Sequence, residues 1–162
     1  MKVEIFNTPK RKRKNDVTIS VKNHKLGRIP NVSLTPIASC PAGLPCTQGN
    51  QCYALKSYVQ YPAVKLAWDS NLAIYLDNPV QYFMDINNYC LARAKRDYFR
   101  WHVAGDIVDQ RYLTGMKFVA MMNPDIRFMA FTKRYELDYS DLPPNLNIIL
   151  SMWPGANCPN EL

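Results

Sequence analysis

The chain has 162 residues, enough for one domain with a hydrophobic core and too few for two domains of ordinary size. Apolar residues make up 48% of it and charged residues 20%, which is typical of a globular protein and excludes a disordered or fibrous one. No apolar run approaches the roughly 20 residues that cross a bilayer, and residues 1–15 hold no secretory signal, so we expect a cytoplasmic protein.

The net charge of +7 comes largely from one basic run, Lys10 to Lys14. Two interpretations of this run are open: a solvated arm, or an arm that binds nucleic acid through its phosphates. Residues 17–21 alternate β-branched and polar side chains, which predicts a short strand. We therefore expect residues 1–30 to form a basic N-terminal arm with a short β appendage.

From residue 32 onward, the sequence alternates strand-like and helix-like segments. Pro62 is expected to kink or restart the first helix, and Asp77 or Asn78 to cap the second, with Pro79 in its first turn. Strands are expected over residues 32–38, 98–103, 127–132 and 147–152, and helices over residues 53–76, 79–95 and 110–122.

This alternation predicts a single α/β domain over residues 31–162, with about four parallel strands and flanking helices. The sheet is expected to be either a small open sheet or the arc of an incomplete β/α barrel, because a closed barrel takes about 250 residues. Ligands bind at the carboxyl ends of parallel strands. We therefore expect the segments that follow the strands, at residues 40–52, 102–106, 132–134 and 151–155, to share one edge.

Three of the five cysteines, Cys40, Cys46 and Cys52, form a C-x5-C-x5-C pattern in a loop rich in proline and glycine. In a reducing compartment such a group binds metal more often than it forms disulfides. Thiolates select iron–sulfur clusters or zinc, and three ligands without a local fourth favour a cluster with one open iron. Zinc, and no metal at all, remain open. Cys90 is expected in the core, and Cys158 is either a ligand or a free thiol.

A second group of candidates follows the later strands. Asp106 is expected either to accept hydrogen bonds from a ligand amine or hydroxyl, or to cap the following helix, a role that Asp109 could share. Gly105 is expected to permit either a backbone conformation or a close approach of a ligand that a side chain would obstruct. His102 is either a structural histidine or a ligand. Lys133 is placed to bind a carboxylate or phosphate, and Ser151 is expected at the same edge.

Several short motifs occur together in a fixed order. They are Ser33-Leu-Thr-Pro36, Cys52-Tyr-Ala54, His102-Val-Ala-Gly-Asp106, Asn123-Pro-Asp-Ile-Arg-Phe128 with Thr132-Lys133, and Leu150-Ser-Met-Trp-Pro-Gly155. The set resembles the bacteriophage gene product eighty-eight family over residues 25–155.

That family is similar to radical S-adenosylmethionine (SAM) proteins, although their usual cysteine spacing is C-x3-C-x2-C. The resemblance implies that Cys40, Cys46 and Cys52 hold a [4Fe–4S] cluster, whose open iron SAM would chelate. It implies that Gly105 and Asp106 hold the SAM amino group and that Lys133 meets its carboxylate. The expected function is a phage-type iron–sulfur protein that, if it is an enzyme, is a minimal radical SAM-like one. The alternative is a zinc-stabilised, non-catalytic module that contacts nucleic acid or a host protein.

Overall fold

The computed structural model describes residues 16–21, 27–48, 51–92 and 97–152. Its elements in chain order are β1 (Asn31–Val32), the 3-10 helix η1 (Pro45–Thr47), α1 (Tyr53–Gln60), α2 (Pro62–Asp77), α3 (Pro79–Leu91), β2 (Tyr98–Trp101), α4 (Gln110–Met122), β3 (Arg127–Thr132) and β4 (Leu146–Leu150).

The four strands form one open sheet in the order β1-β2-β3-β4, and every neighbouring pair is parallel. The register places Val32 beside Trp101, Trp101 beside Ala130, and Thr132 beside Leu150. The predicted α/β fold with an open sheet of about four parallel strands is therefore confirmed. Because the strands are parallel, all four deliver their carboxyl ends to the same edge.

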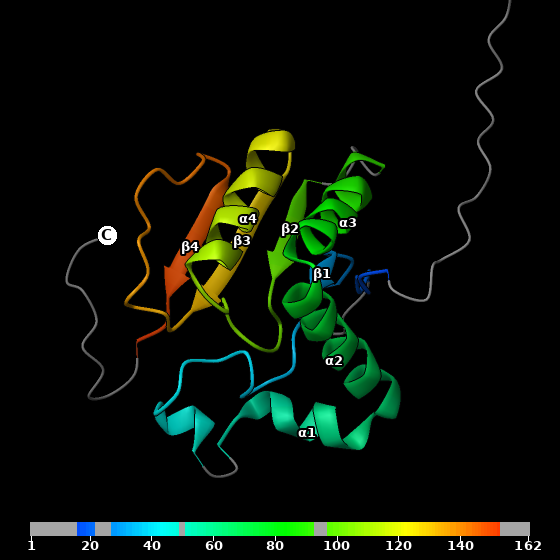
Figure 1. Cartoon of the computed structure of the whole chain (residues 1–162), viewed down its shortest axis with the longest axis vertical. Helices are drawn as coiled ribbons and strands as arrows, with labels where there is room; N and C mark the ends of the chain where they lie inside the picture. The colour runs from blue at the N-terminus through cyan, green and yellow to red at the C-terminus, as the bar shows by residue number, and fades with distance from the viewer. Residues whose placement is uncertain (1–15, 22–26, 49–50, 93–96, 153–162) are drawn as a thin grey trace, which may run out of the picture.

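Helices α3 and α4 lie over one face of the sheet (Figure 1). The side chains that β2 and β3 send toward these helices, among them Phe99, Trp101 and Phe128, are buried. They meet a cluster of rings from the helices: Phe83 packs edge-on against Tyr112, with ring centroids 5.1 Å apart. Such geometry adds to the hydrophobic stabilisation of the core.

The helix starts follow the predicted local signals. Pro62 occupies the first turn of α2 and thereby restarts the helix after α1. The Asn78 side chain caps α3 by accepting a hydrogen bond from the Gln81 backbone N–H at 3.0 Å. α3 is described as far as Leu91, so the expected last turn, up to residue 95, falls mostly on residues 93–96, which lie outside the described residues.

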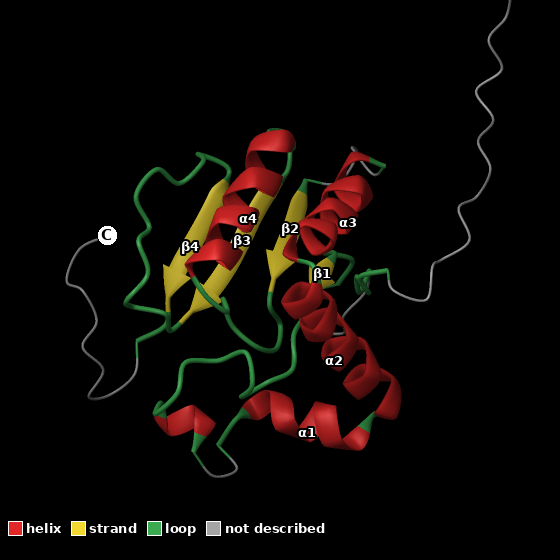
Figure 2. Cartoon of the chain, in the orientation of Figure 1, coloured by secondary structure: helices red, strands yellow, loops and turns green. Residues whose placement is uncertain are grey.

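Three expected strands end earlier than predicted (Figure 2). β1 ends at Val32 rather than at residue 38, because the chain turns over residues 36–39 and Pro36 has no N–H to pair. β2 ends at Trp101 rather than at residue 103, because His102 adopts a left-handed conformation with φ of +55°. β4 likewise ends at Leu150.

The N-terminal segment at residues 16–21 packs on the domain rather than forming a full strand. Ser20 makes a single antiparallel bridge with Asn31, and Val17 is buried in the core. The amide of Asn71 on α2 holds this segment, since it accepts from the Thr18 N–H and donates to the carbonyls of Thr18 and Ser33. The basic run at residues 10–14 lies outside the described residues.

None of the helices within the described ranges combines the length and apolar character needed to cross a bilayer.

Gly115 on α4 provides a test of this packing. A Cβ built there would lie 2.2 Å from the ring of Phe83, so Gly115→Ala should lower the free energy of unfolding by about 2 kcal/mol, although alanine favours helices. Urea denaturation measures this, with the exposed neighbour Thr114→Ala as the control. The added variant Phe83→Leu should relieve part of the clash. Equal stability of Gly115→Ala and the wild type would contradict the packing described.

Candidate functional site

A cavity of about 390 Å³ lies at the carboxyl edge of the sheet, and all eight residues predicted for the site line it. The eight are Cys40, Cys46, Cys52, His102, Gly105, Asp106, Lys133 and Ser151. They come from the segments that follow β1, β2, β3 and β4, so the parallel sheet brings together positions more than a hundred residues apart in the chain.

The three thiols come from the segment between β1 and α1. The segment begins with a turn in which Ile37 has φ of +69°, a conformation that a β-branched residue rarely adopts. Cys46 lies in η1, and Cys52 immediately precedes α1. Within the described residues, no group of three or more histidine, cysteine, aspartate or glutamate side chains is close enough to hold one metal ion. The structure thus places the thiols in one cavity but not in a ligand cluster.

Electrostatics nevertheless link the three thiols. Burial raises the pKa of the Cys40 thiol to about 11, and negative charge on Asp106, Cys52 and Cys46 acts in the same direction. The Cys40 thiol is therefore protonated near neutral pH. The fourth described cysteine, Cys90, is buried in the core on α3, as predicted. Cys158 lies outside the described residues.

Asp106 is buried and joins the ends of two strands. Its Oδ1 accepts hydrogen bonds from the Thr132 hydroxyl at 2.5 Å and the Ile107 N–H at 2.7 Å, and its Oδ2 accepts from the Lys133 N–H at 3.0 Å. Burial raises the pKa of this carboxyl, and the three hydrogen bonds oppose that rise. The helix-cap interpretation of Asp106 is wrong, because Asp109 caps α4 by accepting from the Tyr112 N–H.

Gly105 has the first of its two expected roles, a backbone conformation that a side chain would obstruct. Its φ is +80°, and a Cβ there would lie 2.5 Å from Ser39 Oγ and 2.9 Å from Leu34 Cβ. The missing side chain therefore lets the segment after β2 pack against the segment after β1. The backbone N–H of Asp106 then donates to Ser39 Oγ at 3.3 Å.

His102 is buried, and its ring connects the cavity to a chain of tyrosines. Its Nε2 lies 3.0 Å from the Tyr112 hydroxyl, which is 2.6 Å from the Tyr82 hydroxyl. Burial, with a smaller contribution from the positive charge of Arg100, lowers the pKa of His102 to about 3, so the imidazole is neutral at ordinary pH. Its Nδ1 has no hydrogen-bond partner among the described residues.

The segments after β3 and β4 close the cavity. The Ser151 N–H donates to the Thr132 carbonyl at 2.8 Å, and its own carbonyl accepts from the Tyr135 hydroxyl at 2.5 Å. Arg134 Nε donates to the Ile107 carbonyl at 2.7 Å, which adds a second link between the ends of β2 and β3. The expected neighbours of Ser151, residues 153–155, lie outside the described residues.

Sequence reasoning missed several residues of the cavity wall. Arg100 and Phe131 reach the cavity from the strands themselves, and Tyr53 from the start of α1, where its hydroxyl donates to the Val103 carbonyl. Strand alternation did not mark them, because the left-handed backbone at His102 breaks the alternation after β2 and Lys133 follows the end of β3.

The comparison with family models identifies the chain. The model of the family described as Gene product 88 matches residues 5–153, so the chain belongs to this phage-associated family. Neither the comparison with curated proteins nor the comparison with solved structures gives a significant match.

The buried neutral His102 predicts a pH dependence of stability. Because its folded-state pKa of about 3 lies below the unfolded value of 6.5, the unfolded state binds the extra proton and stability falls as the pH drops below about 6.5. The slope should approach about 1.4 kcal/mol per pH unit. Since asparagine tolerates the left-handed backbone, His102→Asn is a suitable reference without this titration.

Urea unfolding of the wild type and of His102→Asn between pH 7 and pH 4 provides the measurement. The wild type should lose more stability than the variant as the pH falls, while contributions common to both, such as that of Asp106, cancel in the difference. Parallel stability curves would show that His102 titrates in the folded protein near its ordinary pKa.

Proposed function

We propose that this member of the Gene product 88 family binds an iron–sulfur cluster through Cys40, Cys46 and Cys52 in the cavity at the carboxyl edge of its sheet. The observation that carries this proposal is that the three thiols line a single cavity, together with every other residue predicted for the site. Soft thiolate donors in a partly apolar cavity are the chemistry that such clusters require.

The electrostatics of the cavity are consistent with a bound cation. Burial, and to a smaller extent negative charge on Asp106, Cys52 and Cys46, raises the pKa of Cys40, and a cation held among these groups would favour its thiolate. Ligation requires the thiols to approach one another more closely than described. Pro41, Gly43 and Pro45 favour turns in this segment.

The wall of the cavity also offers groups for a small polar cofactor, for which SAM is the candidate. A carboxylate has about four acceptor positions, and Asp106 uses three, which leaves one for an amine. Lys133 is the candidate for a carboxylate, and Gly105 and Ser151 line the same space. His102, with a neutral ring and an Nδ1 without a partner among the described residues, can accept from or donate to such a ligand.

When bound at an open iron, SAM would supply radical chemistry, whereas the residues above would bind and orient it. This part of the proposal depends on the cluster, and binding of SAM to the purified protein tests it separately.

Replacing the cysteines tests the cluster. Cys40→Ala, Cys46→Ala and Cys52→Ala should each abolish iron and acid-labile sulfide in anaerobically purified protein, because three thiolates are the minimum ligand set. The matched control is Cys90→Ala, which removes a cysteine from the core and should leave the iron content unchanged.

Metal and sulfide analysis decides between the outcomes, with EPR of the reduced protein before and after addition of SAM. About four irons per chain are expected for a [4Fe–4S] cluster. Stoichiometric zinc without sulfide would instead support a zinc-stabilised binding module. Iron content that survives all three substitutions would refute the assignment of the ligands.

A further inference from the structure

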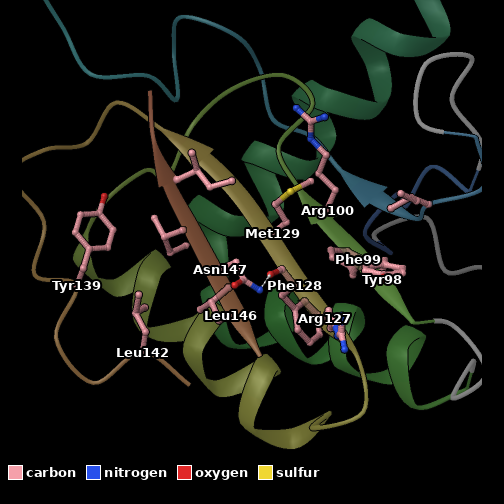
Figure 3. Close-up of a pocket in the computed structure, with 13 residues that line it drawn as sticks. Tyr98, Phe99, Arg100, Arg127, Phe128, Met129, Tyr139, Leu142, Leu146 and Asn147 are labelled. Carbon is pink, nitrogen blue, oxygen red and sulfur yellow. Dashed lines mark hydrogen bonds between the residues drawn. The ribbon is translucent and has the colours of Figure 1, made fainter. Parts of the chain in front are cut away.

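The sheet face opposite α3 and α4 carries a second pocket, of about 750 Å³ (Figure 3). Side chains of β2, β3 and β4 that point to this side are exposed or half-buried, in alternation with the buried ones. Parallel sheets are normally covered on both faces, so a face that none of the described helices covers indicates a binding surface. The strand residues on this face are Tyr98, Arg100, Arg127, Met129, Phe131, Asn147 and Ile149. All of them except Phe131 line the pocket, and Phe131 lines the cysteine cavity at the carboxyl end of the same face.

The chemistry of this face is aromatic and positively charged. Arg100 and Arg127 both line the pocket, and no aspartate or glutamate does so among the described residues. Tyr98 is 50% exposed and Phe131 is 38% exposed. We propose that the open face of the sheet binds single-stranded nucleic acid, with bases stacked on its aromatic rings and phosphates held by its arginines.

The two aromatic rings are separate stacking positions. Tyr98 pairs with Arg127 in the register, and Phe131 lies four residues further along β3, a separation of roughly 13 Å. One base cannot reach both rings, whereas successive bases of a single strand can. Stacking of this kind requires unpaired bases, which excludes a duplex as the preferred ligand.

Arg100 lies between these two positions. Its guanidinium carbon is 5.2 Å from the centroid of the Phe131 ring, a cation–π contact that orients the side chain. Its Nε is buried and has no hydrogen-bond partner within the described part of the chain. An arginine held in this way offers its remaining donors to a phosphate or to a base edge.

Asn147 completes the polar part of the face. Its Nδ2 donates to the Phe128 carbonyl at 3.3 Å, which fixes the side chain (Figure 3). The amide oxygen is then available to accept a hydrogen bond from a base.

Charge favours this ligand over a second copy of the chain. Two copies packed face to face would bring Arg100 and Arg127 of one near those of the other, and each chain carries a net charge of +7. An anionic partner, by contrast, is attracted to the two arginines of this face. The proposal does not rest on the iron–sulfur cluster, because none of the three cysteines lines this pocket. Arg100 and Phe131 line the cysteine cavity as well, so the two spaces are neighbours.

Fluorescence anisotropy of the full chain with a labelled twelve-nucleotide oligouridylate tests the proposal. Tyr98→Ala should weaken binding roughly tenfold through lost stacking. Arg127→Ala should weaken binding and reduce the slope of log affinity against log salt by about 0.7. The matched controls are Tyr61→Ala and Arg111→Ala, which should leave affinity unchanged. They remove an equally exposed tyrosine from the junction of α1 and α2 and an exposed arginine from α4.

The basic run at residues 10–14 also attracts phosphates, so the same substitutions are measured in a second variant that lacks its charges. Repeating the series with all five of its residues changed to glutamine should lower affinity overall and preserve the loss caused by Tyr98→Ala. If affinity depends on the run alone, if a duplex of equal length binds as tightly, or if no binding occurs at physiological salt, the proposal is wrong.

Analytical ultracentrifugation of the same preparations tests whether the face binds a second copy of the chain. Metal analysis tests whether binding of the oligonucleotide depends on the cluster. A wild-type dimer that Tyr98→Ala converts to monomer would assign the face to a second copy instead. Anaerobically purified protein that binds oligouridylate but holds no iron would refute the cluster and leave this site intact.

Discussion

One buried carboxylate holds the carboxyl edge of the sheet together. Asp106 receives the Thr132 hydroxyl and the Lys133 N–H from the end of β3, and its own N–H donates to Ser39 in the segment after β1. Three segments that are distant in the chain are thereby fixed relative to one another. Every wall of the cysteine cavity belongs to one of these segments or is bonded to one.

The cost of burying unpaired polar groups favours the complete hydrogen-bond network around Asp106 over a partial one. A carboxylate removed from water is costly unless its oxygens are hydrogen-bonded, and each buried group left without its partner costs about 1–3 kcal/mol. The donors to Asp106 are mostly backbone N–H groups and one hydroxyl, with Ser39 also bonded to the Thr35 carbonyl. The network is fully paired only when all three segments are in place, so it favours one geometry of the edge.

Local signals were sufficient to predict most of the fold. The alternation of β3 and the first-turn prolines of α2 and α3 act within a few residues, so the strand and both helix starts follow from the sequence. The sharing of one edge by the cysteine loop, Asp106 and Lys133 was also predictable, because parallel strands align their carboxyl ends.

The remaining features depend on distant partners. β1 is short because the chain turns over residues 36–39, and its continuation is held by a distant partner, with the Leu34 N–H donating to the Ala104 carbonyl after β2. The left-handed backbone at His102 and the partners of Asp106 involve residues up to 67 positions away, which no local pattern encodes. The open face of the sheet was not predicted either. Alternation along a strand predicts that its side chains point to opposite faces, but it does not show which face other elements cover.

Arg100 is common to two spaces, because it lines both the cysteine cavity and the pocket on the open face. A guanidinium group has a fixed number of donors, and those turned toward one space are withdrawn from the other. Two ligands that both contact this side chain are therefore thermodynamically linked, and occupancy of either space changes the affinity of the other by the same factor. Such reciprocity requires no change of fold, only the choice of rotamer of one arginine.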